Sequence, residues 1–142
     1  MLLNIVIAIL MMAATTAIHA GGMSLALHEI KSQGGRVLRR LRKRRIYRVV
    51  AIVLLMFLVS LLEVLLWAGT YLVLNALQDF ERALYFSMVT FTTLGYGEIV
   101  LDERWRLLAS FEAANGIIMF GWTTAIVIAA VQRAYFSGES QR

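Results

Sequence analysis

The chain has 142 residues, of which 60% are hydrophobic and 16% are charged, and it contains neither proline nor cysteine. Soluble domains have roughly 45–50% apolar and 25% charged residues, so this composition excludes an ordinary soluble domain. Without cysteine there is no disulfide and no thiolate site, and only His19 and His28 could supply imidazole, so we expect neither an enzyme nor a bound cofactor.

Three apolar runs are long enough to cross a membrane, which takes about 20 residues. They cover residues 1 to about 20, 49 to about 77 and 107 to about 136. No basic residue precedes the first run, which argues against a cleaved signal peptide. We therefore expect an all-α membrane protein with three transmembrane helices, over residues 1–28, 49–77 and 106–136.

A basic segment follows the first apolar run, because nine of the fourteen Lys and Arg residues lie between residues 31 and 48. Lys and Arg beside transmembrane helices normally stay in the cytoplasm. We therefore expect a multi-pass protein of the cell membrane with its N-terminus outside. Residues 29–48 are then a cytoplasmic basic loop or interfacial segment, and residues 137–142 are a short cytoplasmic tail without a sensing domain. The net charge of +5 then reflects topology, and nucleic-acid binding is not expected.

The basic segment has two further interpretations. Every third residue from Arg36 to Arg48 is an arginine, as in voltage-sensing helices, but other basic residues fill the gaps and the run is too short to span a membrane. Contact of Arg36–Arg48 with anionic lipids is the alternative that we keep beside a purely topological role.

The segment between the second and third apolar runs contains a short predicted helix, over residues 81–92. Asp79 is placed to act as its N-cap, and Glu81 lies in the first turn, where negative charge suits the helix dipole. At about 1.5 Å per residue this helix reaches only part of the way through a bilayer. Irregular backbone at that depth is tolerated only where protein buries it or where it lines a water-filled cavity, so the next residues are expected to line a pore.

Those next residues, 92–98, read Thr-Thr-Leu-Gly-Tyr-Gly-Glu, and they resemble the selectivity filter of the tetrameric potassium channel family. Gly95 and Gly97 can adopt positive φ, which lets successive carbonyls point to one side. The resemblance covers residues 65–131, including residues 83–87 of the short helix and an ungapped register along the last apolar run. It implies a pore domain over residues 49–136, with an outer helix, a re-entrant pore helix, the filter loop and an inner helix.

The resemblance also implies the function and its residues. It implies a homotetramer around a central pore that conducts K⁺, with the ion passing through as a permeant species. The expected K⁺ ligands are the carbonyl groups of Thr93, Leu94, Gly95 and Tyr96. The expected supports of the filter are Thr92, Gly97, Glu98, Tyr85, Phe86 and Glu112, and the expected gating hinge and cavity residues are Gly116, Ile117, Phe120, Gly121 and Thr124.

Three positions depart from the family pattern. Leu94 stands where valine is usual, Glu98 stands where aspartate is usual, and Val89 stands where some members have a carboxylate. Because the chain has no proline, a bending inner helix would need glycine as its hinge. The departures at Leu94, Glu98 and Val89 reduce the bracing expected around the filter, so a weakly selective cation channel remains an alternative function. A non-conducting accessory membrane subunit is a second alternative, and a proton-coupled carrier is disfavoured because the chain has no repeated halves.

Glu63 is an ionisable residue in the middle of the second apolar run, where burying a charge costs roughly 2.5–3.5 kcal/mol. A partner inside the helix bundle is therefore expected. Counting from the helix ends puts Trp122 at the same depth, and Thr15 or Thr16 of the first helix could also reach it. We favour a structural tie between helices over a gating or proton-sensing role.

Three other polar residues of the apolar runs have plainer interpretations. Asn115 is expected to form a hydrogen bond between helices or to the pore helix, whereas His19 and His28 are expected to be neutral residues at the inner end of the first helix. The first helix itself is expected to pack on the outside of the pore domain.

Overall fold

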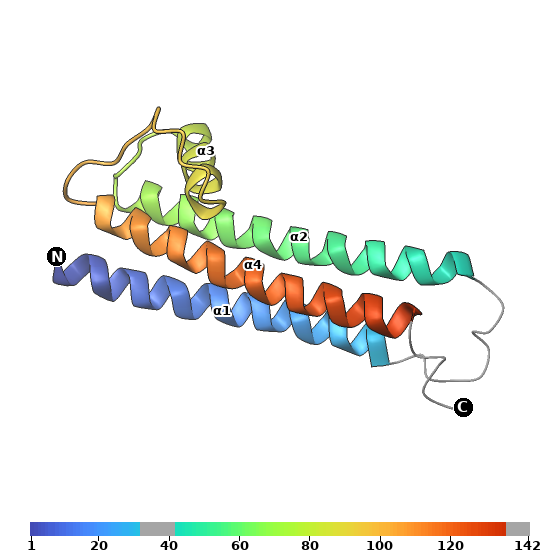
Figure 1. Cartoon of the computed structure of the whole chain (residues 1–142). Coiled ribbons are helices and arrows are strands. Elements are labelled where there is room, and N and C mark those ends of the chain that lie inside the picture. The colour runs from blue at the N-terminus through green and yellow to red at the C-terminus, as the bar shows by residue number, and fades with distance from the viewer. Residues whose placement is uncertain (32–41, 136–142) are drawn as a thin grey trace.

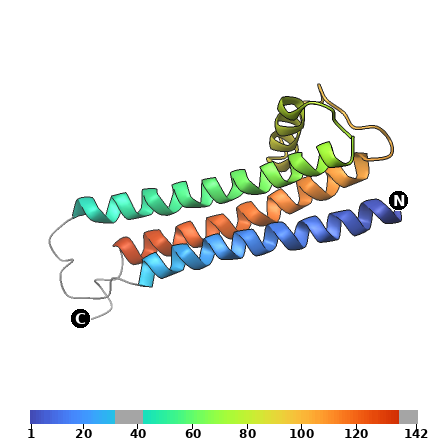
Figure 2. The same cartoon turned by 180° about the vertical axis from the view of Figure 1, so that it is seen from behind.

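The computed structural model describes residues 1–31 and 42–135. Within these ranges the chain forms α1 (Leu2–Lys31), α2 (Arg42–Val73), α3 (Phe80–Phe91) and α4 (Arg106–Tyr135) (Figure 1). The three long helices lie side by side, and the short α3 packs against α2 and α4 near one end (Figures 1 and 2). The expectation of an all-α protein with a short helix between two long ones is confirmed. The expected tail at residues 137–142 and the centre of the basic segment, residues 32–41, lie outside the described residues.

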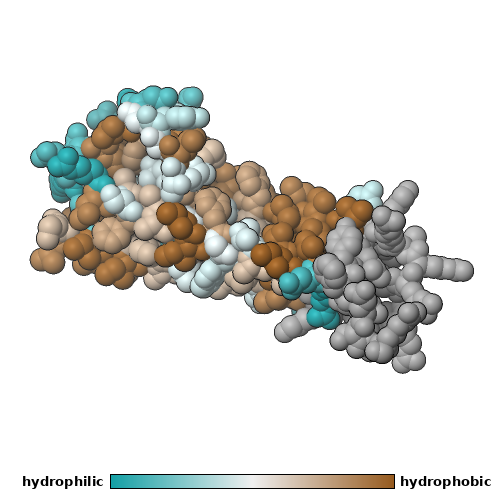
Figure 3. Space-filling model, viewed as in Figure 1, coloured by the Kyte–Doolittle hydropathy of each residue, from teal (hydrophilic) through white to brown (hydrophobic). Residues whose placement is uncertain are grey.

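The long helices are apolar enough to cross a membrane. Candidate spans cover Leu2–His28 in α1, Ile46–Val73 in α2 and Arg106–Arg133 in α4. On the face shown in Figure 3, hydrophobic residues cover much of the rod and hydrophilic residues gather at the end that carries α3 and its loops. The chain is a multi-pass membrane protein with three candidate spans, as the apolar runs predicted.

The boundaries of α2 differ from the expected outer helix at residues 49–77. The helix begins at Arg42, so residues 42–48 of the basic segment belong to α2 and not to a loop. Arg and Lys are good helix formers, so a helix can extend beyond the apolar segment that crosses the membrane. The smaller differences at α3 and α4 are one residue at each end or less.

The end of α2 at Val73 is set by Asn75, which adopts a left-handed conformation with φ 53°. Its N–H donates to the Leu72 carbonyl at 3.0 Å, and the Ala76 N–H donates to the Tyr71 carbonyl at 2.9 Å. These two bonds form a Schellman motif, in which asparagine replaces the usual glycine. The motif stops the helix while the sequence is still apolar, which explains why hydropathy overestimated its length.

The start of α3 follows the sequence prediction. Asp79 is its N-cap, with extended backbone and a side chain that accepts a hydrogen bond from the Arg82 N–H at 3.0 Å, and Glu81 lies in the first turn. A cap of this kind stabilises a helix by about 1 kcal/mol, which matters for a helix of only 12 residues.

Helix α1 packs against both α2 and α4, on the side of them opposite to α3 (Figures 1 and 2). Its buried residues recur every third or fourth position and are small or polar along much of the helix. They are Asn4, Ala8, Met11, Thr15, His19, Gly22 and Ala26. Lipid tails are as apolar as leucine, so helices in a membrane associate through close packing of small residues and through hydrogen bonds. This stripe therefore gives α1 a specific docking face.

Gly22 is where α1 approaches α2 closely, and we predict that Gly22→Ile destabilises the protein. A Cβ at Gly22 would lie 2.5 Å from Cγ2 of Val59. Overpacking of this kind typically costs about 1–3 kcal/mol, so thermal unfolding in detergent should occur at a lower temperature. Gly21→Ile is the matched control, because a Cβ at Gly21 meets nothing within 4 Å. Equal unfolding temperatures for the two variants would contradict this packing.

Candidate functional site

The backbone after α3 folds back onto the last turn of that helix. The N–H groups of Thr92, Thr93, Leu94 and Gly95 donate to the carbonyls of Met88 (3.1 Å), Thr90 (2.9 Å), Val89 (2.9 Å) and Val89 (3.2 Å), respectively. A trans peptide is planar, so each N–H points opposite to the carbonyl of the preceding residue. The carbonyl oxygens of Thr92, Thr93 and Leu94 therefore face away from the end of α3.

Every second residue of this segment has positive φ. The values are 60° at Thr93, 55° at Gly95 and 88° at Gly97. The glycines behave as the sequence predicted, whereas a β-branched residue rarely adopts positive φ, so the conformation of Thr93 was not foreseen. The side chains of Leu94 and Tyr96 are 54% and 64% exposed in the single chain.

Tyr85 and Glu98 tie α3 to the far end of the same loop. The Tyr85 hydroxyl donates to Oε2 of Glu98 at 2.6 Å. This hydrogen bond raises the pKa of the Tyr85 phenol above its ordinary value, because the neutral phenol is the donor. Glutamate is longer than the aspartate usual in the resembled family, and here its reach matches a tyrosine of α3.

Glu112 is buried where α2, α3 and α4 meet. Its Oε2 accepts a hydrogen bond from the Tyr71 hydroxyl at 2.6 Å, and its Oε1 lies 2.5 Å from Oγ of Ser87. Ser87 Oγ also lies 2.9 Å from the carbonyl oxygen of Val64, although a hydroxyl has only one hydrogen. A proton on Glu112 satisfies both contacts of the serine at once. Glu112 therefore joins α3 to α2 and α4, and its hydrogen-bond partners Tyr71 and Ser87 both lie outside the loop at residues 92–98.

Phe86 supports this junction from α3. Its side chain is only 8% exposed, and its ring lies edge-on to that of Tyr71, with the ring centroids 5.2 Å apart. The residue therefore points into the bundle and packs against α2.

Gly116 lies against the C-terminal end of α3. A Cβ at this position would be 1.9 Å from the carbonyl oxygen of Phe91, which is a backbone atom that cannot turn aside. A residue larger than glycine is therefore excluded by packing. By contrast, a Cβ at Gly121 meets nothing within 4 Å.

The other expected gating and cavity residues share one exposed face of α4. Ile117, Phe120, Gly121 and Thr124 are all exposed in the single chain and recur at helical spacing. Phe120 also stacks edge-on against Phe91, with ring centroids 5.7 Å apart. This face therefore adjoins the C-terminal end of α3, where the loop begins.

The partner of Glu63 differs from the expectation. Its Oε1 lies 2.9 Å from Nδ1 of His19, and both side chains are fully buried. His19 therefore lies inside the helix bundle, whereas it was expected at the inner end of the first helix. Thr15 instead donates to the Met11 carbonyl and accepts a hydrogen bond from Asn115 at 2.9 Å. The signal that could have identified His19 is its place on the small and polar stripe of α1.

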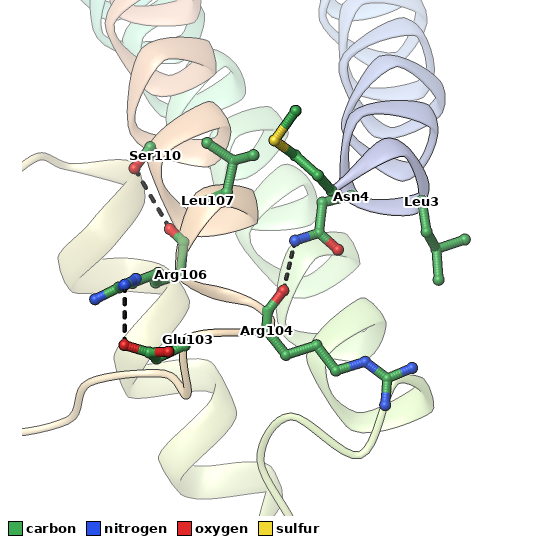
Figure 4. Close-up of a pocket in the computed structure, with 8 residues that line it drawn as sticks. Leu3, Asn4, Glu103, Arg104, Arg106, Leu107 and Ser110 are labelled. Atoms are coloured by element: carbon green, nitrogen blue, oxygen red, sulfur yellow. Dashed lines mark hydrogen bonds and ion pairs between the residues drawn. The ribbon is translucent and has the colours of Figure 1, made fainter.

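A separate pocket lies at the end of the bundle where α1 and α4 begin (Figure 4). Asn4 donates to the Arg104 carbonyl at 2.5 Å, which ties α1 to the residues before α4. The Arg106 guanidinium pairs with Glu103 at 3.2 Å.

Within the described ranges, no three His, Cys, Asp or Glu side chains are grouped so as to hold a metal ion.

A multi-pass membrane protein that inserts a short helix and an irregular loop between two spans has the architecture of a pore domain. Residues 50–133 match the sequence profile of a family described as ion channel, which is more than half of the chain, so the chain belongs to this ion channel family. The match includes α3, the loop and nearly all of α2 and α4, and it leaves α1 outside. No solved structure was found that matches the chain. Because the family consists of channels, the expectation that the chain is not an enzyme is confirmed.

We predict that Gly116→Ala destabilises the protein, because the added methyl group overlaps the Phe91 carbonyl. The expected loss is about 1–3 kcal/mol, measured as a lower unfolding temperature of the detergent-solubilised protein. Gly121→Ala is the control and should be neutral or slightly stabilising, since alanine is the better helix former. An unchanged unfolding temperature for Gly116→Ala would show that α3 does not press on α4 in the folded protein.

We predict that Tyr85→Phe loosens the loop without unfolding the protein. Removing the hydroxyl removes the hydrogen bond to Glu98, so amide hydrogen exchange should become faster at residues 95–99. Tyr47→Phe, which changes an exposed tyrosine on α2, serves as the control. Unchanged exchange in this loop would mean that the bond does not restrain it.

Proposed function

We propose that the chain is one subunit of a homotetrameric, K⁺-selective channel. The observation that carries this proposal is the backbone of residues 92–97, in which positive φ alternates along the chain and the N–H groups turn toward α3. Carbonyl oxygens are then free to face a common axis. Rings of such carbonyls replace the hydration shell of a K⁺ ion, with Thr93, Leu94, Gly95 and Tyr96 as its ligands.

The exposure of the loop supports a tetramer. One strand cannot surround an ion, and the chain contains a single copy of the loop. Leu94 and Tyr96 are more than half exposed in the single chain, and neighbouring subunits around a four-fold axis would cover such apolar surfaces. In that arrangement Thr92 and Gly97 flank the ligand positions.

The short helix supports cation binding electrostatically. The C-terminal end of α3 carries about half a negative charge from its backbone dipoles. It ends at Phe91, beside the exposed face of α4 that holds Ile117, Phe120 and Thr124. We assign this face to the central cavity, so that the α3 dipole stabilises a cation there.

We assign the gating hinge to Gly121 and not to Gly116. A bend at Gly116 would disturb its contact with the Phe91 carbonyl, which supports the filter, whereas Gly121 lies free of such contacts. Gly121 is also one turn further from the filter along α4. A bend there moves the end of the inner helix while α3 stays in place.

The proposed orientation places the N-terminus and the filter outside the cell membrane. The start of α1 and the loop before α4 lie at the same end of the bundle, because Asn4 bonds to the Arg104 carbonyl. The basic residues at 42–48 lie at the opposite end, where α2 begins. The positive-inside tendency assigns that end to the cytoplasm, where Arg36–Arg48 can contact anionic lipids.

The proposal predicts K⁺ flux from the purified protein in liposomes under a K⁺ gradient, with block by Ba²⁺ and little flux when Na⁺ replaces K⁺. Gly95→Ala should abolish the flux, because alanine is strained at φ 55°, while Gly69→Ala in α2 is the control. Equal Na⁺ flux would identify a weakly selective cation channel instead. Intact tetramers without any flux would identify an accessory subunit.

A further inference from the structure

Three polar side chains meet inside the bundle where α1, α2 and α4 touch. Nδ1 of His19 lies 2.9 Å from Oε1 of Glu63, and Nε2 of His19 lies 3.3 Å from Oγ1 of Thr123. The side chains of His19 and Glu63 are completely buried. Both nitrogens of the imidazole are thus engaged, one by the outer helix and one by the inner helix.

One carboxylate oxygen of Glu63 makes no hydrogen bond within the described residues. Its Oε2 is buried and has no hydrogen-bond partner among the described residues. The Trp122 ring lies beside the pair, with its centroid 6.1 Å from that of the His19 ring. Two other buried ionisable groups of the described bundle, Glu112 and Tyr71, belong to the separate junction with Ser87.

The charge of the pair depends on its protons. The pair is neutral when it carries one titratable proton, whichever partner holds it. Binding of a second proton gives the pair a net positive charge, and loss of its one proton gives it a net negative charge. In both cases a net charge lies in a buried interface, which would have to loosen or admit water to accommodate that charge. The docking of α1 is therefore coupled to proton binding at this pair.

Thr123 belongs to α4, so its contact with His19 links the packing of α1 to the inner helix. Helix α1 bonds to the α4 side of the bundle at three levels: Asn4 to the Arg104 carbonyl, Thr15 with Asn115, and His19 with Thr123. The first two bonds lie before Gly121 in the chain and the third lies after it. Helix α1 consequently spans the glycine at which we propose that α4 bends, and it restrains α4 on both sides.

We propose that His19 and Glu63 form a proton-binding site through which α1 restrains the inner helix, and that binding of a second proton releases α4 and increases ion flux. The flux readout rests on the proposed function. Proton binding itself does not, because it can be observed in the protein without any ion current.

The first experiment measures K⁺ flux through the full-length protein in liposomes. Flux should rise about tenfold when the pH is lowered from neutral into the acidic range, because coupling between two sites commonly changes an equilibrium by about that factor. His19→Asn retains an amide donor toward Glu63 but removes the imidazole, so the pair can no longer gain a net positive charge and its flux should not rise at low pH. His28→Asn changes the exposed histidine of the same helix and should keep the wild-type response. A pH-independent wild type, or an unchanged response in His19→Asn, would overturn the proposal.

The second experiment reads the site through Trp122. A protonated imidazole quenches the fluorescence of an adjacent indole, so tryptophan emission should fall as the pH falls in the wild type and in His28→Asn. The fall should be absent from His19→Asn. If no variant conducts K⁺ but this titration is present, the proposed function fails and the proton-binding site stands. A titration that is identical in all three proteins would refute the site whatever the flux.

Discussion

The structure depends on one constraint, which is that irregular backbone inside a membrane must find its hydrogen bonds within the protein. The segment after α3 meets this constraint by donating four backbone N–H groups to the last turn of that helix. Its carbonyls are thereby turned away from α3 and left available. The same bonds that satisfy the N–H groups of the loop therefore leave free the carbonyls on which the proposed ion binding depends.

The loop keeps its position only if α3 keeps its position, and a helix as short as α3 is not stable on its own. Contacts with the rest of the protein must therefore hold it. Asp79 caps the start of α3 locally, Ser87 meets Glu112 at its middle, and the Phe91 carbonyl lies against Gly116 at its end. Glu112 and Gly116 both belong to α4, so α4 holds α3 at two levels. The position of α3 is thus set by polar bonds and close packing, which are the forces available in lipid.

The two buried acids of the spans have comparable placements and different consequences. Glu112 is satisfied by two hydroxyl groups at a junction of α2, α3 and α4, so it ties these three helices together. Glu63 bonds to a histidine of α1, a helix outside the matched family region, and keeps one oxygen unpartnered among the described residues. The first arrangement is suited to rigidity, whereas the second links the additional helix to the others.

Local composition was enough to predict the three apolar helices, the cap at Asp79 and the positive φ of Gly95 and Gly97, because each depends on residues close together in the chain. The tertiary structure alone decided that Glu63 bonds to His19 and that Gly116 lies against Phe91. These pairs lie on different helices, and their meeting depends on how far each helix is rotated and shifted along its neighbours. Residue spacing within one helix does not specify that rotation or shift, so packing among the helices determines it.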